Sequence, residues 1–399
     1  MSHLHCFGKG LLPAVIALAL LTAPAFGATV YGAGNLDESV FANAVPAAAS
    51  DFDYQLLDSL EGVVLLRYTG KAQEIILPQE IEGFPVQRIE GRAFYSTNVK
   101  TVVIPDSVVS MGREAFAQCS NLVSVRLSPT MRVISGGAFS GCSKLENVVI
   151  PPSVDTMISR AFRYTGIRSI TLPPNMGFRS YAGDTPIPSP EVFESCSKLE
   201  TVVLPETMTV LPEKTFASCT ALKEVTLPPG LEVIQKDAFT SCKGLQKLVL
   251  PETLHTIEDA LNGTGLVELA FPNSVKEFHC RLYSCPNLEV VRLPDSLEEL
   301  EEGLFYNPNR RESRVKLRSI NLPAALKKVS ATAFYGMGTL TEVLIPESLT
   351  EVEFDGKLEP DPNHPYGGLL TQTWAFLGTS LPLATQARLK KMGYYGSFR

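Results

Sequence analysis

Histidine, the side chain most often used for catalysis and metal binding near neutral pH, is scarce in this sequence. The chain of 399 residues has five histidines, and His3 and His5 stand in an N-terminal segment that we expect to be removed. The sequence also lacks a phosphate-binding glycine loop, a Gly-x-Ser-x-Gly motif and a His-Glu-x-x-His motif. These absences argue against an enzyme and predict that no cofactor is needed.

Metal-ligand patterns are weak as well. His279, Cys280 and Cys285 are ligand types without the paired spacing of a zinc site. The run 355–364 is rich in oxygen ligands but lacks the pattern and closing glutamate of an EF-hand loop. We interpret it as a solvated loop and predict no metal.

A basic block is missing too. Lys and Arg number 35 against 42 Asp and Glu, which gives a formal net charge of −7. A mildly acidic chain is a poor candidate for nucleic-acid binding and has little attraction to an anionic membrane. The expected partner is therefore a protein.

Long apolar runs are absent after the N-terminus. The run Leu11–Leu21 follows Lys9 and precedes the small residues up to Ala28, which is the pattern of a signal peptide. We expect residues 1–28 to be cleaved and the protein to be secreted or placed on the cell surface; an uncleaved membrane anchor is the alternative. The mature chain is not expected to span a membrane.

What the sequence does contain is a repeat. Pro205, Pro228 and Pro251 are 23 residues apart, and the residues between them repeat one pattern. The pattern is an apolar strand ending in Leu-Pro, a turn, a second apolar pair, and Phe-x-x-Cys. About eleven such units fill residues 75–352, and a unit of this length needs neighbours to bury its apolar face.

Each unit is expected to form one coil. Leu222, Val225 and Leu227 alternate with polar residues as in a strand, and Pro228 ends it. Leu231, Ile234 and Phe239 return the chain to the core. Stacking these coils predicts a ladder of parallel strands about 4.8 Å apart and about 55 Å long, with one long sheet and a looser outer side.

The pattern L-x-x-V-x-L/I-P-x-S/T-V/L-x-x-I-x-x-x-A-F-x-x-C-x-x-L resembles the BspA-like (Treponema pallidum type) leucine-rich repeat family. The resemblance covers about 270 of the 399 residues, and residues 121–139 and 145–162 match with few exceptions. It implies a leucine-rich-repeat solenoid, a right-handed coil with a parallel β ladder on one face. It also implies a bacterial-type secreted or surface protein. Some relatives bind host matrix proteins or other cells.

The two ends differ from the repeats. Residues 29–50 are weakly patterned and are interpreted as a flexible spacer, and the alternation within 51–74 predicts a β-hairpin cap. Residues 353–399 are expected to form a loop and a short helix that covers the last coil. A partner-binding tail is the alternative for this segment.

Insertions and the outer strand face are the candidate protein contacts. Pro173 to Pro205 spans 32 residues and Pro294 to Pro323 spans 29, so each carries an inserted loop. The strand face presents an aliphatic column bordered by mixed charge. The candidate contact residues are Phe178, Arg179, Tyr181, Arg310, Arg311, Arg314, Val149, Val203 and Val249. Loops without a partner, and valines present only because they favour strands, are the alternatives.

Most cysteines occupy one slot of the repeat. These residues are Cys119, Cys142, Cys196, Cys219, Cys242 and Cys285. A cysteine fixed to one position of each coil is expected to point inward as a small buried thiol. Disulfides between stacked neighbours, or between Cys280 and Cys285, are the alternatives.

The function expected from these features is a non-enzymatic protein-binding or adhesion module that uses the solenoid face or the insertion loops. The alternative is a structural spacer in an assembly of the cell envelope. The sequence predicts neither the ligand nor the mode of attachment to the cell.

Overall fold

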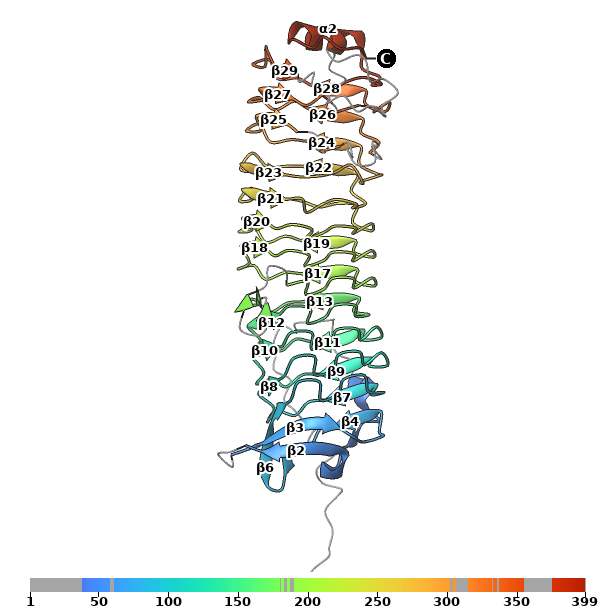
Figure 1. Cartoon of the computed structure of the whole chain (residues 1–399), viewed down its shortest axis with the longest axis vertical. Coiled ribbons are helices and arrows are strands. Elements are labelled where there is room, and N and C mark those ends of the chain that lie inside the picture. The colour runs from blue at the N-terminus through green and yellow to red at the C-terminus, as the bar shows by residue number, and fades with distance from the viewer. Residues whose placement is uncertain are drawn as a thin grey trace, which may run out of the picture.

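The computed structural model describes residues 38–57, 61–179, 181–182, 185–186, 190–301, 304–305, 315–331, 333–335, 337–354 and 375–398. Within them the chain winds into a parallel β-solenoid of about 12 turns (Figure 1). The predicted coil with stacked parallel strands is therefore confirmed.

The predicted strands form a first ladder along one side of the coil. In β19 the side chain of Val225 is buried, whereas Glu224 and Thr226 on either side of it are exposed, as strand alternation requires. The ladder falls into three groups of paired strands. These are β1 (Val45–Pro46), β4 (Glu74–Ile76), β7 (Thr101–Val103), β9 (Ser124–Arg126) and β11 (Asn147–Val149); β13 (Ser169–Thr171), β17 (Thr201–Val203) and β19 (Glu224–Thr226); and β22 (Glu268–Ala270), β24 (Val290–Arg292), β26 (Ser319–Asn321) and β28 (Glu342–Leu344).

A second parallel ladder, which the sequence did not predict, lies on another side of the coil. Its strands have mostly two or three residues, and each brings one apolar side chain inward, as Leu211 and Ile234 do in neighbouring coils. After the N-terminal sheet its strands are β10 (Val133–Ile134), β12 (Thr156–Ile158) and β14 (Gly177–Arg179); β18 (Val210–Leu211), β20 (Val233–Ile234), β21 (Thr256–Glu258) and β23 (Glu277–His279); and β25 (Glu299–Leu300), β27 (Lys328–Val329) and β29 (Glu353–Phe354).

The third side of the coil carries the phenylalanine slot. The amide of Phe116 donates to the carbonyl of Ala138 in the next coil over 2.8 Å, and most coils repeat this bond. Glu114 and Gln118, which flank the phenylalanine, take left-handed φ angles of 57° and 61° and so turn the chain sharply. Backbone hydrogen bonds therefore join successive coils on all three sides.

The phenylalanine rings stack into a column inside the third side. From Phe94 to Phe239 neighbouring ring centroids lie between 4.6 Å and 5.8 Å apart. The column is interrupted at Leu261 and Leu282 and resumes at Phe305, whose ring lies 5.9 Å from that of Phe334. Each stacked pair is worth about 0.5–1.5 kcal/mol beyond the area it buries, so the column stabilises the array along its length.

A hairpin covers the first coil. Strands β2 (Phe52–Leu56) and β3 (Val63–Tyr68) pair antiparallel, and β3 then pairs in parallel with β6 (Phe84–Ile89). The short strand β5 (Glu80–Ile81) pairs antiparallel with β6, which also pairs with β8 (Ser110–Met111). The ring of Tyr68 stacks on Phe94 at 5.2 Å and so ends the aromatic column at this side.

Residues 38–50 are not a flexible spacer, and that part of the 29–50 interpretation is wrong. They form the 3-10 helices η1 (Glu38–Phe41) and η2 (Ala49–Asp51), and between these β1 pairs with β4. The side chain of Phe41 is buried, and Glu38 forms an ion pair with Arg126 at 3.0 Å. The expected signal peptide, residues 1–28, and the remainder of the spacer lie outside the described residues.

The predicted C-terminal helix is present as α2 (Leu383–Lys391), and it lies at the end of the solenoid (Figure 1). Leu389 is buried, and the guanidinium of Arg388 donates to the carbonyl of Pro346 in the last coil over 2.7 Å. Tyr394 follows the helix and packs edge-on against Phe376 at 5.3 Å. Within the described part of the chain, no helix has the length and apolarity needed to cross a bilayer.

Candidate functional site

The outer face of the first ladder carries a column of exposed side chains. Val203 and Val249 are 51% and 68% exposed, and Thr226 lies between them in the order of the coils. Their neighbours Val202 and Leu248 point into the core, which fixes the outward direction of the column. We call Val203, Thr226 and Val249 the apolar strip.

Strand register and repeat spacing relate the members of the apolar strip. Val203 and Thr226 are direct partners in the pairing of β17 with β19, and Val249 follows Thr226 at the repeat distance of 23 residues, in a segment that is not itself a strand of the ladder. Adjacent rungs of a ladder lie about 4.8 Å apart, so a partner strand or helix could contact all three side chains at once. Val149, the third valine expected in this column, is half-buried.

Charged side chains border the strip and neutralise one another along the axis. Lys223 contacts Glu200 at 2.6 Å, and Lys198 contacts Glu146 at 2.8 Å. Arg168 lies 3.7 Å from both of these glutamates. The hydrogen bond from Lys223 lowers the pKa of Glu200, and that from Lys198 lowers the pKa of Glu146. These carboxylates remain ionised but are already paired, so the apolar strip is the part of the face with unused contact area.

The first insertion contributes less exposed surface than expected. Phe178 lies in β14, and its partly buried ring packs edge-on against Phe193 at 6.2 Å. Phe178 stays a candidate contact residue, but its strand continues the second ladder and turns part of the ring toward the core, which leaves less of it exposed. Arg179 is exposed. Tyr181 lies on β15 (Tyr181–Ala182), which pairs antiparallel with β16 (Thr185–Pro186).

The second insertion carries the other three candidate contact residues of the loops. Its three candidate residues, Arg310, Arg311 and Arg314, lie outside the described residues.

The cysteine slot holds buried, free thiols. Each thiol donates to the main-chain carbonyl of the phenylalanine slot one coil earlier; Cys142, for example, lies 3.1 Å from the carbonyl oxygen of Phe116. The same bond recurs at Cys119, Cys196, Cys219, Cys242 and Cys285, over 2.9 Å to 3.4 Å. The slot is thus a hydrogen-bonding position within the core.

Threonine fills the same slot at four places in the described residues, which the sequence interpretation missed. The hydroxyls of Thr165, Thr264 and Thr379 donate to the phenylalanine-slot carbonyl of their own coil, over 2.8 Å, 2.9 Å and 2.8 Å. Thr97 occupies the equivalent position and contacts the thiol of Cys119 at 3.3 Å. The signal was a repeated Phe-x-x-Thr, or Leu-x-x-Thr, in place of Phe-x-x-Cys.

Burial makes most of these thiols poor nucleophiles. It raises the pKa of Cys196 to about 11 and that of Cys242 to about 12. Cys119 differs, because its hydrogen bond with Cys142 lowers its pKa to about 7. A metal binds the thiolate, so thiols with raised pKa values are unsuited to that role. Among the described residues, no group of three or more His, Cys, Asp or Glu is arranged to hold a metal ion.

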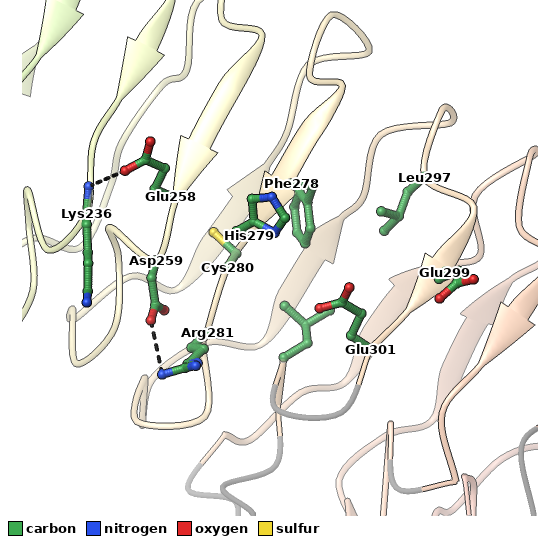
Figure 2. A pocket seen from close by; sticks show the side chains of 11 residues that line it. Lys236, Glu258, Asp259, Phe278, His279, Cys280, Arg281, Leu297, Glu299 and Glu301 are labelled. Atoms are coloured by element: carbon green, nitrogen blue, oxygen red, sulfur yellow. Dashed lines mark hydrogen bonds and ion pairs between the residues drawn. The ribbon is translucent and has the colours of Figure 1, made fainter.

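A cavity of about 450 Å³, which was not predicted, opens on the side of the second ladder between β23 and β25. Figure 2 shows Phe278, His279 and Cys280 on one wall, and Leu297, Glu299 and Glu301 on the other. Asp259 and Arg281 line it as well and form an ion pair at 3.3 Å. The His279–Cys280 pair is therefore part of a cavity wall.

The comparisons with known proteins agree with this architecture. A family model described as the BspA type leucine rich repeat region matches residues 66–182, 187–312 and 311–355, in six copies. No curated protein matches the sequence.

Among solved structures, a leucine-rich repeat protein from Bacteroides ovatus ATCC 8483 is 24% identical, with a TM-score of 0.61 over 78% of this chain and 79% of that chain. A leucine rich cell surface protein from Faecalibacterium prausnitzii A2-165 is 20% identical, with a TM-score of 0.42 over 88% of this chain and 98% of that one. The leucine rich repeat protein of T. pallidum is also 20% identical, with a TM-score of 0.23 over the same shares. The similarity to the first of these is one of fold.

Proposed function

The chain belongs to the BspA type leucine-rich repeat family, and on this basis we propose that it is a non-enzymatic protein-binding module. Its contact surface is the apolar strip Val203, Thr226 and Val249. Repeat solenoids commonly bind proteins along an extended face of this kind.

The observation that carries the proposal is the exposure of the two valines. Burying the exposed part of such a side chain on binding is favourable by about 25 cal/mol for each Å² of apolar area. The strip is extended rather than hollow, and its bordering charges are paired with each other. This surface suits a partner that presents an apolar ridge to the long axis of the solenoid.

Export to the cell surface or into the medium is part of the proposal. It is supported by the apolar run Leu11–Leu21 with its small-residue ending. Adhesion to host matrix or to another cell would then be one use of the strip.

A spacer role in an assembly of the cell envelope is the second candidate. The continuous phenylalanine column and the hydrogen bonds on three sides of the coil favour it, because they make the array stiff. A spacer needs its two ends but does not need the apolar strip.

The test uses the chain from residue 29 onward as bait for extracellular-matrix proteins and cell-envelope fractions. A retained protein is then titrated against V249D and against V109D, a matched change at a valine that is 52% exposed on another part of the surface. The proposal expects V249D to weaken binding at least about tenfold and V109D to leave it unchanged. Equal binding by both variants would exclude the strip and leave the spacer role.

A further inference from the structure

Among the described residues the second ladder is interrupted after β8, after β14 and after β23. The last interruption lies between two strands that ought to be neighbours. β23 pairs with β21 on one edge, and β25 pairs with β27 on the other, but in the described residues β23 and β25 do not pair with each other. In Figure 1 the two strands lie further apart than β21 and β23 on one side or β25 and β27 on the other. We call this space the ladder gap.

The missing bonds can be named from the neighbouring coils. The amides of Lys276 and Glu277 both donate to the carbonyl of His255, and those of Lys327 and Lys328 both donate to the carbonyl of Glu298. The equivalent bonds, from the amides of Glu298 and Glu299 to the carbonyl of Lys276, are not formed within the described part of the chain. The ladder gap therefore leaves donors on one edge and an acceptor on the other.

The two remaining sides of the coil stay closed across the ladder gap. In the first ladder, β22 pairs with β24. On the third side the amide of Leu282 still donates to the carbonyl of Leu304 over 2.6 Å. The gap is therefore a slot in one wall, held open by a continuous scaffold behind it.

The sequence accounts for the slot. The coil from Pro251 to Pro272 has 21 residues where its predecessors have 23. Leu261 and Leu282 replace two stacked phenylalanines in the same region, so the aromatic column that spaces the other coils is lost there. The short coil itself keeps its strand β21 paired with β20 and with β23, so the break falls one coil later, beside Leu282, where the core has no stacked ring.

The chemistry of the slot is apolar inside and acidic at the rim. Leu304 and Cys280 are 5% and 8% exposed, and the rings of Phe278 and Phe271 pack edge-on at 4.8 Å beside them. Four carboxylates and two cations line the slot, the carboxylates being those of Glu258, Asp259, Glu299 and Glu301. One cation is engaged by a carboxylate of the slot, because Arg281 contacts Asp259, and the main-chain amide of Lys236 donates to Glu258 (Figure 2).

One polar atom in the slot has no partner. Oδ1 of Asp259 is buried and makes no hydrogen bond, although the other oxygen of this carboxylate contacts Arg281. A buried acceptor without a donor is unfavourable by about 1–3 kcal/mol unless a ligand satisfies it.

We propose that the ladder gap binds a short extended peptide strand with alternating apolar and basic side chains, which supplies the missing rung. The peptide carbonyls would accept from the amides of Glu298 and Glu299, and a peptide amide would donate to the carbonyl of Lys276. Its apolar side chains would enter the slot, and its lysine or arginine side chains would meet Glu299 and Glu301. Addition of a strand to a free sheet edge is an established mode of peptide recognition.

The size of the cavity suits a short peptide strand better than it suits part of a globular protein. Its volume of about 450 Å³ is in the range of pockets for small ligands and suits two or three residues of a strand. The gap lies on a different side of the coil from the apolar strip, so the proposal does not depend on the proposed function.

The probe is a fluorescent peptide with the sequence Gly-Lys-Val-Lys-Val-Lys-Gly, titrated against the chain from residue 29 onward by fluorescence polarisation. Saturable binding is expected. The same peptide with N-methylated valines should bind at least about tenfold more weakly if main-chain bonds provide the affinity. A peptide with glutamate in place of lysine should not bind.

Two double variants distinguish peptide binding in the slot from non-specific attraction between opposite charges. E299K/E301K should weaken binding at least about tenfold. The matched control E252K/E347K reverses two exposed carboxylates elsewhere and should bind within about twofold of the unaltered chain. V249D, which tests the apolar strip, should bind the peptide normally. Hydrogen exchange at the amides of Glu298 and Glu299 should slow when the peptide is present.

Three results would overturn the proposal: no saturable binding at millimolar peptide, equal binding of the N-methylated peptide, or an equal loss with E252K/E347K. Circular dichroism of each variant shows whether a loss of binding has a structural cause. If E299K/E301K is misfolded, hydrogen exchange in the unaltered chain decides, and unchanged exchange at both amides would count against the proposal.

Discussion

The thiol of Cys219 donates a hydrogen bond to the carbonyl oxygen of Phe193, which is 3.1 Å away and belongs to the preceding coil. The same carbonyl accepts the amide of Cys196 within its own coil, also over 3.1 Å. Each buried carbonyl of this kind therefore has one donor from its own turn and one from the next. The cysteine slot links adjacent coils without any covalent bond.

Replacement of Cys219 by alanine should lower the free energy of unfolding by about 1–2 kcal/mol, because the carbonyl of Phe193 loses one donor. C219S retains a donor and should be less destabilised than C219A. Urea unfolding followed by circular dichroism measures both. If C219S is the less stable of the two, the thiol contributes through its volume and the hydrogen bond is unimportant.

Phe216 tests the aromatic column. Its ring lies 5.8 Å from that of Phe193 and 5.7 Å from that of Phe239. F216A should reduce the free energy of unfolding by about 3–5 kcal/mol, because a cavity replaces a buried ring in the middle of the stack. F216L, which copies the residue found at position 261, should reduce it by about 1 kcal/mol. Similar losses for both would mean that stacking matters more than volume.

Gly265 lies where two coils approach too closely for a side chain. A Cβ atom added there would overlap the carbonyl oxygen of Lys243, whereas one added at Gly230 would meet no atom within 4 Å. G265A should therefore destabilise the chain by about 2 kcal/mol or more, since main-chain atoms must move. G230A is the matched control and should change the midpoint of urea unfolding little. Equal midpoints for the two variants would contradict the close approach of these coils.

Glu191 predicts a dependence of stability on pH. Burial alone would raise its pKa, but the hydrogen bond from Arg160 at 2.6 Å and the nearby charges of Arg163 and Lys214 lower it below the ordinary value. A group whose pKa is lower in the folded state stabilises the fold above its unfolded pKa, here about 4.3. This contribution is lost as the pH falls through the folded pKa.

The measurement is the difference in unfolding free energy between the unaltered chain and E191Q. This difference should be largest between pH 6 and pH 8 and should shrink below about pH 4. A difference that stays constant down to pH 3 would show that the ion pair does not contribute.

The periodic features of the fold could be predicted, and the irregular ones could not. Proline spacing and the phenylalanine slot identify the coil because every unit repeats them. Strands such as Val210–Leu211 have two residues, which is too short for an alternation to be visible, so the second ladder was missed. The segment 38–50 was misjudged because its order comes from contacts with β4 and Arg126, which are distant in sequence.

The candidate sites were predicted less well for the same physical reason. The outward direction of Val203 and Val249 follows from strand alternation, but the direction of Phe178 depends on the strand that its insertion joins. The ladder gap is defined by hydrogen bonds that are not made, which no residue pattern states directly. The related change in the sequence is the replacement of phenylalanine by Leu261 and Leu282 in the coils before the gap.

The hydrogen bonds between coils run along the length of the solenoid, and this determines how the molecule would respond to a mechanical load. A protein tethered at one end and pulled at the other would load these bonds one layer after another. The layer between β23 and β25 lacks one of the two ladders, whereas the layer that joins β17 to β19 and β18 to β20 has both, so we expect stretching to begin at interrupted layers such as the first of these. A rod of this kind would lengthen in a defined order, opening at its interrupted layers before its fully bonded ones.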